Sequence, residues 1–109
     1  MSYEVALTKS ASRDLEEIYD YIELHDGRRP ADDLLNALEE GFASLESLPN
    51  RGTVPNELEE LGIMEFREIF FKPYRIIYEV TEKQVIVYLI ADGRREMRAL
   101  LERRLLRDP

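Results

Sequence analysis

The sequence predicts an α+β fold in which a helical hairpin packs on a mostly antiparallel four-stranded sheet, in the order β-α-α-β-β-β, followed by a short C-terminal helix. Apolar residues recur at helical spacing through the first half of the chain, and runs rich in β-branched and aromatic residues fill the second half. Very short connections join these runs, which requires antiparallel neighbours. At 109 residues, the chain is expected to form one domain spanning residues 1–109.

The N-terminal half begins with residues 3–8, whose loose alternation predicts a first strand. Ser10 is the expected N-cap of a helix that ends near His25-Asp26-Gly27, with apolar residues at 3.6-residue spacing. Pro30 suits the first turn of a second helix, which is expected to close at Leu48-Pro49. Together these helices predict an antiparallel hairpin.

The C-terminal half begins with a loop at residues 49–60, which is rich in proline, glycine and acidic side chains. Strands are predicted at 62–71, 74–81 and 84–91. The chain then turns at Asp92-Gly93 into a short helix that is expected to begin with Arg94-Arg95.

The predicted sheet has more apolar side chains than one helical hairpin can cover, because a hairpin covers one face only. We expect the second face to show Ile69, Phe71 and Ile77 beside Arg67 and Arg75. An exposed apolar area with a charged rim is typical of a docking surface for a protein partner.

Composition and charge narrow the class of protein. The 44% hydrophobic and 35% charged residues indicate a soluble globular chain, and the absence of cysteine suits the cytoplasm. No signal peptide is recognised, and the longest apolar run, Val85 to Ala91, is too short to span a bilayer. Net charge is −8: residues 1–60 carry −10 and residues 61–109 carry +2. This balance disfavours direct nucleic-acid binding and favours a protein partner.

Catalytic and metal-binding patterns are missing from the sequence. His25 is the one histidine, and its place at a predicted helix end has a structural explanation. Glu57, Glu59 and Glu60 are expected to be solvated in the loop, so we predict no metal or cofactor. The serines lack a neighbouring base and the five glycines form no phosphate-binding loop, so we predict that the protein is not an enzyme.

The arginines remain to be explained. Arg94 and Arg95 at a helix N-terminus would oppose the helix dipole, at about 0.3–1 kcal/mol each. A local rule broken without compensation is where function is sought first. Arg67 and Arg75 are either edge charges or charges on the open face. The other arginines have local explanations, since Arg98 can pair with Glu102, and the last helical turns favour Arg103, Arg104 and Arg107.

Over nearly its whole length the sequence resembles the RelE/ParE toxin superfamily, and within it the ParE branch. The resemblance rests on the order and spacing of several motifs: Tyr3 to Thr8, Ala11-x-x-Asp14-Leu15-x-x-Ile18-x-x-Tyr21-Ile22, Leu48-Pro49-x-x-Gly52, Tyr74 to Val80, Asp92-Gly93-Arg94-Arg95-Glu96-Met97 and Leu100-Leu101-x-Arg103-Arg104-Leu105-Leu106.

The resemblance implies the toxin of a type II toxin–antitoxin pair, whose partner is a ParD-like antitoxin of the ribbon-helix-helix type. ParE-like toxins act on DNA gyrase without being enzymes. RelE-like relatives instead cleave mRNA on the ribosome, using cations that Arg75 and Arg95 could supply here. They commonly carry a Tyr or His near the C-terminus, and this chain has neither after Ile90. An inactive relative that only binds its antitoxin is a third possibility.

Two sets of contact residues follow. We expect the open sheet face to bind the antitoxin, and the final helix to contact the target. The antitoxin residues are Arg67, Tyr74, Arg75, Ile77, Tyr78 and Tyr88, and the target residues are Arg94, Arg95 and Arg98.

Overall fold

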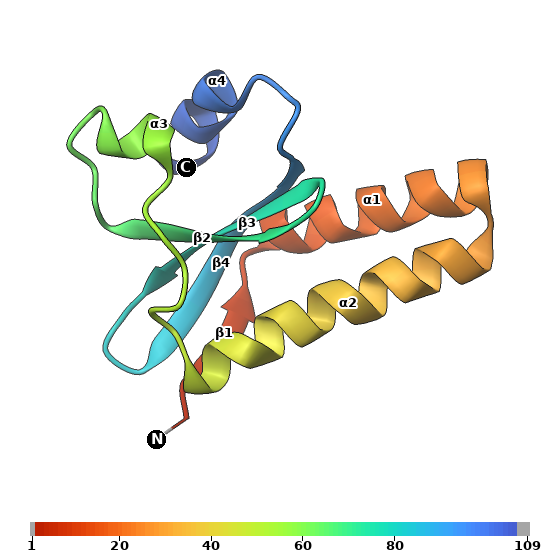
Figure 1. Ribbon diagram of the computed structural model, residues 1–109, viewed down its shortest axis with the longest axis horizontal. Coiled ribbons are helices and arrows are strands. Elements are labelled where there is room, and N and C mark those ends of the chain that lie inside the picture. The colour runs from red at the N-terminus through yellow and green to blue at the C-terminus, as the bar shows by residue number, and fades with distance from the viewer. Residues whose placement is uncertain (1, 107–109) are drawn as a thin grey trace.

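The computed structural model describes residues 2–106 and contains a four-stranded sheet with helices on both faces (Figure 1). The predicted α+β class, the helical hairpin and the C-terminal helix are confirmed. The elements are β1 (Glu4–Leu7), α1 (Lys9–Asp26), α2 (Arg28–Ser47), α3 (Asn56–Glu59), β2 (Phe66–Phe71), β3 (Tyr74–Val80), β4 (Gln84–Asp92), α4 (Met97–Leu101) and a π-helical turn, η1 (Glu102–Leu106).

The strands lie in the order β1-β4-β3-β2. Strands β2, β3 and β4 are antiparallel neighbours, as their short connections predict. Strand β1 pairs in parallel with β4, from Glu4 opposite Gln84 to Leu7 opposite Val87. The sheet is therefore mixed, and the α1–α2 hairpin lies between β1 and the other strands in sequence.

The hairpin forms close to where the sequence places it. The N-cap of α1 is Thr8 rather than Ser10, and its hydroxyl accepts a hydrogen bond from the Ala11 N–H at 3.0 Å. Gly27 joins the two helices with a φ of +104°, a conformation that side-chain-bearing residues rarely adopt. The turn between the helices therefore depends on this glycine.

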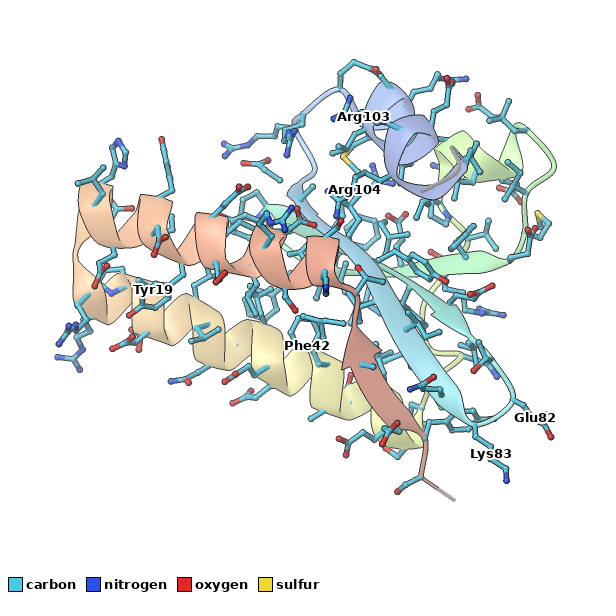
Figure 2. All side chains as sticks on the ribbon, turned by 180° about the vertical axis from the view of Figure 1, so that it is seen from behind. Tyr19, Phe42, Glu82, Lys83, Arg103 and Arg104 are labelled. Atoms are coloured by element: carbon cyan, nitrogen blue, oxygen red, sulfur yellow. The ribbon has the colours of Figure 1, made fainter. Side chains whose placement is uncertain are left out.

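One face of the sheet packs on the hairpin. Leu38, Phe42 and Leu45 of α2 meet Ile76 and Val87 of the sheet in this core (Figure 2 shows Phe42 pointing away from α2 toward the sheet). Full burial of side chains of this size stabilises a fold by roughly 1.5–3 kcal/mol each. The hairpin is thus held by a continuous apolar layer.

The second face of the sheet is covered as well, so the prediction of an open face is wrong. Helices α3 and α4 and the turn η1 lie over it (Figure 1). Ile77, which was expected to be exposed, is 0% exposed. Its neighbours in this second core are Leu58 of α3, Met97, Leu100 and Leu101 of the C-terminal segment, and Phe66, Leu89 and Ala91 of the sheet. Most of the surplus apolar residues of the sheet are therefore used inside the molecule, whereas Phe70 and Phe71 at the end of β2 stay 58% and 39% exposed.

The strand register also corrects the expected grouping of side chains, because directly paired residues share one face of a sheet. Ile69 pairs with Ile76 and packs in the hairpin-side core, not on the second face. The pairing of Phe71 with Tyr74 places Phe71 on the hairpin side too. Arg67 pairs with Tyr78, and Arg75 pairs with Phe70. The first pair lies on the hairpin side of the sheet, and the second pair lies on the opposite side. The two arginines are therefore not neighbours.

A β-bulge explains why β4 is apolar on both sides. Ile77 pairs with Leu89 but Tyr78 pairs with Val87, which leaves Tyr88 as the extra residue. The bulge shifts the alternation of side chains. Val85 and Val87 consequently face the hairpin, whereas Leu89 and Ala91 join the second core.

Candidate partner-binding surface

Exposed apolar side chains lie both on the helical hairpin and on strand β2, where Phe70 is 58% and Phe71 is 39% exposed. The joined ends of α1 and α2 project beyond the sheet (Figure 1). On this overhang Ile18 and Ile22 are only half-buried, while Tyr21 is 61% and Leu24 is 81% exposed. Solvent-exposed apolar residues that gather in one region are typical of interaction surfaces.

A cleft of about 570 Å³ lies between this overhang and the end of the sheet. Glu17 and Asp26 of α1 give it an acidic wall, and Arg94 and Arg95 give it a basic wall. Apolar and aromatic side chains separate the two walls. They are Ile18, Tyr21, Ile22, Tyr74, Ile90 and Ala91.

The turn from Asp92 to Arg95 carries the basic wall. Asp92 accepts hydrogen bonds from the backbone N–H of Arg94 at 2.9 Å and from its Nη2 at 2.6 Å. The Arg94 guanidinium holds the pKa of the Asp92 carboxyl down to about 2. Because it is bound in this way, Arg94 has little freedom to meet a partner.

The C-terminal helix does not begin with Arg94-Arg95, and this prediction is wrong. Helix α4 begins at Met97, and the Glu96 carboxylate caps it by accepting hydrogen bonds from the N–H groups of Arg98 and Ala99 at 3.3 and 2.9 Å. A carboxylate at this place agrees with the helix dipole. The two arginines precede the helix and do not oppose its dipole.

The three arginines predicted to contact the target have different environments. Arg94 is paired with Asp92, and Arg98 is paired with Glu60 at 2.7 Å rather than with Glu102. Arg95 is exposed and has no ion-pair partner among residues 2–106. It is therefore the cation of this group that is free to bind another molecule.

Arg75 is buried among carboxylates, and the expectation of an edge or open-face charge is wrong. Its Nε donates to Glu68 at 2.6 Å, and its two terminal nitrogens donate to Glu57 at 2.9 and 2.8 Å. Arg75 lowers the pKa of Glu57, whereas burial raises the pKa of Glu68 more than Arg75 lowers it. All three nitrogens of the guanidinium group are thus engaged in charge-assisted hydrogen bonds.

Of the three glutamates that were expected to be solvated in the loop, Glu59 and Glu60 are exposed as predicted, whereas Glu57 is partly buried. Glu57 belongs to α3 and binds Arg75, and Glu60 binds Arg98 of α4. The short helix is thereby attached both to the sheet and to the C-terminal helix. Among residues 2–106, no group of three or more His, Cys, Asp or Glu side chains could hold a metal ion.

Arg67 and Tyr78 hold the segment that leads from α2 to α3. The Tyr78 hydroxyl donates to the Pro49 carbonyl at 2.8 Å and accepts from the Gly52 N–H at 3.0 Å. Arg67 donates to the Gly52 carbonyl at 2.7 Å. A Cβ at Gly52 would overlap the Glu68 carbonyl, so glycine is required where the segment crosses β2.

Arg104 anchors the C-terminal helix to α1, as its side chain in Figure 2 indicates. Its terminal nitrogens donate to both oxygens of Asp14, at 3.0 and 2.8 Å, and to the Tyr88 carbonyl at 3.0 Å. Asp14 also accepts from the Ile90 N–H at 3.1 Å. From the sequence, Arg104 was expected only to favour the helix dipole, and its contact with Asp14 was not predicted. Both Asp14 and Arg104 belong to the motifs on which the resemblance to the ParE branch rests. Arg107 is outside the described residues.

The remaining predicted contact residues differ in accessibility. Tyr74 lines the cleft, although little of it is exposed, and burial raises its pKa. Tyr88 is half-buried and donates to Glu79 at 2.9 Å. Ile77 and Tyr78 are 0% exposed. Contact between these residues and an antitoxin stays a prediction.

His25 stacks on Tyr21 at the end of α1, with 4.1 Å between ring centroids.

Comparison with known proteins identifies the class. The family model for the ParE toxin of type II toxin–antitoxin systems (parDE) matches residues 5–97, and the chain belongs to this family. Toxin ParE3 of Caulobacter vibrioides is 28% identical over 97 residues, covering 89% of this chain and 93% of the relative. The resemblance to the ParE branch is confirmed.

Two solved structures share the fold. A chain of the chromosomal ParDE system from P. aeruginosa matches with a TM-score of 0.70 and 21% identity, covering 84% of this chain and 96% of that one. A chain of the RelBE2 toxin–antitoxin complex from Mycobacterium tuberculosis matches with a TM-score of 0.62 and 20% identity, covering 84% and 92%. No helix within residues 2–106 has the length and apolar character needed to cross a membrane.

Proposed function

We propose that this protein is a toxin that inhibits DNA gyrase without catalysing a reaction, and that a ParD-like antitoxin of the ribbon-helix-helix type neutralises it. Inhibition of gyrase is the general function of the ParE toxin family, to which the chain belongs. Action on gyrase would place the protein in the cytoplasm. The burial of Arg75 in ion pairs with Glu57 and Glu68 is the observation that most supports a non-enzymatic mechanism.

Cleavage of mRNA needs a group to activate the 2′-hydroxyl, a group to protonate the leaving oxygen, and cations for the developing charge. Glu57 and Glu68 accept hydrogen bonds from all three nitrogens of the Arg75 guanidinium and offset its charge, and the side chain is only 11% exposed, so it is poorly placed to bind a phosphate. His25 stacks on Tyr21 at the hairpin end rather than beside Arg75. A net charge of −8 also disfavours binding to ribosomal RNA.

Of the six residues proposed for the antitoxin, Arg67 and Tyr88 are half-buried and Tyr74 lines the cleft, so these three are the candidates for direct contact. Arg75, Ile77 and Tyr78 are buried and would act indirectly, by holding the sheet and its connecting segment. For gyrase, we propose that Arg95 leads the contact, with Arg94 and Arg98 contributing only if their ion pairs open.

A pair of assays on the purified protein tests this proposal. We expect micromolar protein to inhibit DNA supercoiling by gyrase, and to leave mRNA intact in a translating extract. A matched pair of variants, Arg95→Ala and Arg29→Ala, removes one exposed arginine each, and only the first should weaken inhibition. Cleavage of translated mRNA by the wild-type protein would instead favour the RelE-like mechanism. Absence of both effects, with antitoxin binding retained, would indicate an inactive relative.

A further inference from the structure

The turn that carries Arg95 packs directly on the side chain of Arg75. The Gly93 N–H donates to the Pro73 carbonyl at 2.7 Å, and a Cβ on Gly93 would lie 2.9 Å from Cδ of Arg75. A real Cβ does not approach another atom this closely, so the turn can lie against Arg75 only with glycine at this position. The place of the turn therefore depends on where the Arg75 side chain is held.

Arg75 is held by carboxylates from two other elements. Its Nε donates to Glu68 of β2 at 2.6 Å, and its Nη1 and Nη2 donate to the two carboxylate oxygens of Glu57 of α3 at 2.9 and 2.8 Å. A bidentate pair fixes the orientation of the guanidinium plane as well as its position. The Arg75 side chain is only 11% exposed, so solvent screens these pairs weakly. Arg75 thus forms a firm link between α3 and the turn.

A second contact joins α3 to the other end of the turn. Helix α3 lies beside α4 (Figure 1), and Glu60, which follows α3, binds Arg98 of α4 at 2.7 Å. Leu58 of α3 is 1% exposed in the second core and seats this short helix on the sheet. Glu57 and Glu60 are only three residues apart, so one short segment supports the turn on both sides.

We propose that Glu57 is a positioning residue for gyrase inhibition, which holds Arg95 in place through Arg75 and Gly93. The inference rests on the proposed function, since Arg95 is the cation assigned there to gyrase. The Arg95 side chain has no ion-pair partner within residues 2–106, so the backbone of the turn decides where its charge is presented. Moving the turn therefore moves the charge that meets the target.

The test compares two substitutions that each remove one negative charge from α3. Glu57→Gln breaks the ion pair with Arg75, whereas Glu59 is exposed and has no ion-pair partner in the described part of the chain. We expect the protein concentration that gives half-maximal inhibition of supercoiling to rise about fivefold for Glu57→Gln. For Glu59→Gln, we expect it to change by less than about twofold.

A double-mutant cycle separates positioning from a general loss of stability. If Glu57 acts through Arg95, Glu57→Gln should weaken inhibition little further once Arg95→Ala has been made. Val85→Ala is the control for stability, because it removes methyl groups from the hairpin-side core at the opposite end of β4. We expect Val85→Ala to lower the melting temperature measured by circular dichroism and to leave inhibition within about twofold.

A second pair of variants tests the same link at the turn itself. Gly93→Ala must displace the turn from Arg75, whereas a Cβ on Gly41 comes no closer than 3.7 Å to its neighbours. We expect about fivefold weaker gyrase inhibition for Gly93→Ala and no loss for Gly41→Ala. This pair keeps the inference testable if Glu57→Gln does not fold.

Two results would overturn the inference. Wild-type inhibition in both Glu57→Gln and Gly93→Ala would show that the turn does not need this support. Additive effects of Glu57→Gln and Arg95→Ala would show that Glu57 acts independently of Arg95. In both cases the wild-type protein still inhibits gyrase and the proposed function stands, whereas a wild-type protein that leaves supercoiling unchanged would contradict both.

Discussion

Arginines of the C-terminal half carry the same charge but have different physical roles. Arg75 and Arg104 are largely buried in carboxylate pairs that join distant elements, with side-chain exposures of 11% and 19%. Removing one partner from such a pair leaves an uncompensated charge, which is costly. Arg95 is solvated and free, so a substitution there should change binding and leave stability almost unaffected.

Tyr78 offers a direct test of the segment between α2 and α3. Tyr78→Phe removes the hydroxyl but keeps the ring, and leaves the Gly52 N–H and Pro49 carbonyl without that partner. We expect the free energy of unfolding in urea to fall by about 1–3 kcal/mol. Tyr21→Phe, which alters an exposed ring, should change it by less than about 0.5 kcal/mol. Equal effects would contradict the role of the Tyr78 hydroxyl.

Asp92 predicts a pH dependence of stability. Its folded-state pKa is about 2, below the ordinary 3.8, so its contribution is complete above pH 3.8 and is lost as the pH falls toward 2. We therefore expect wild type to unfold at a higher temperature than Asp92→Asn at pH 6, and the difference to narrow between pH 4 and pH 2. A difference that is constant across this range would contradict the Asp92–Arg94 pair.

The partners of these residues could not be predicted from the sequence, because they are distant along the chain. Glu57 and Arg75 are 18 residues apart, and Asp14 and Arg104 are 90 residues apart. Local rules for the helix dipole and for i,i+4 pairs gave Arg98 and Arg104 the wrong roles. Arg95 was singled out because it was expected to open the final helix, but that helix begins at Met97, and a role of Arg95 in binding stays a prediction.

At the scale of elements, the two shortest helices decide whether the second sheet face is open. Helices α3 and α4 have four and five residues, which is far too short to be stable in isolation. Their stability comes from Leu58 and Leu101 in the second core and from the ion pairs of Glu57, Glu60 and Arg104. The sequence predicted the C-terminal helix but not α3, and helices this short show no periodicity from which the face that they cover could be predicted.

The anchor between Asp14 and Arg104 can be measured with a double-mutant cycle. We expect Asp14→Asn and Arg104→Gln each to lower the free energy of unfolding by about 1–3 kcal/mol, and their effects to be non-additive. Arg103→Gln is the matched control, since Arg103 is exposed and next in sequence. Additive effects, or an equal loss in the control, would show that Arg104 does not hold the C-terminal helix.

The hairpin and the three antiparallel strands were predictable because helical periodicity and short turns are local features. The face of the sheet on which each side chain lies was not predictable, since it depends on the register between strands and on the bulge at Tyr88. The expected open face was therefore wrong, and the exposed apolar residues of the hairpin overhang, Tyr21 and Leu24, were not predicted.

At the scale of the whole molecule, the charge is divided between two regions. The hairpin from Lys9 to Ser47 carries 11 Asp and Glu against 4 Lys and Arg, and the C-terminal segment carries the exposed arginines. The two regions meet at the cleft, where carboxylates of α1 face the arginines of the turn before α4 across apolar side chains. A surface that combines apolar side chains with charges of both signs is suited to binding other proteins.

The most direct test of this account is a gyrase supercoiling assay in which the antitoxin is added in increasing amounts. We predict that the purified protein inhibits supercoiling at micromolar concentration, and that an equimolar amount of antitoxin restores it. Full supercoiling activity at saturating protein, combined with cleavage of translated mRNA, would contradict the central claim that this family member acts by binding rather than by catalysis.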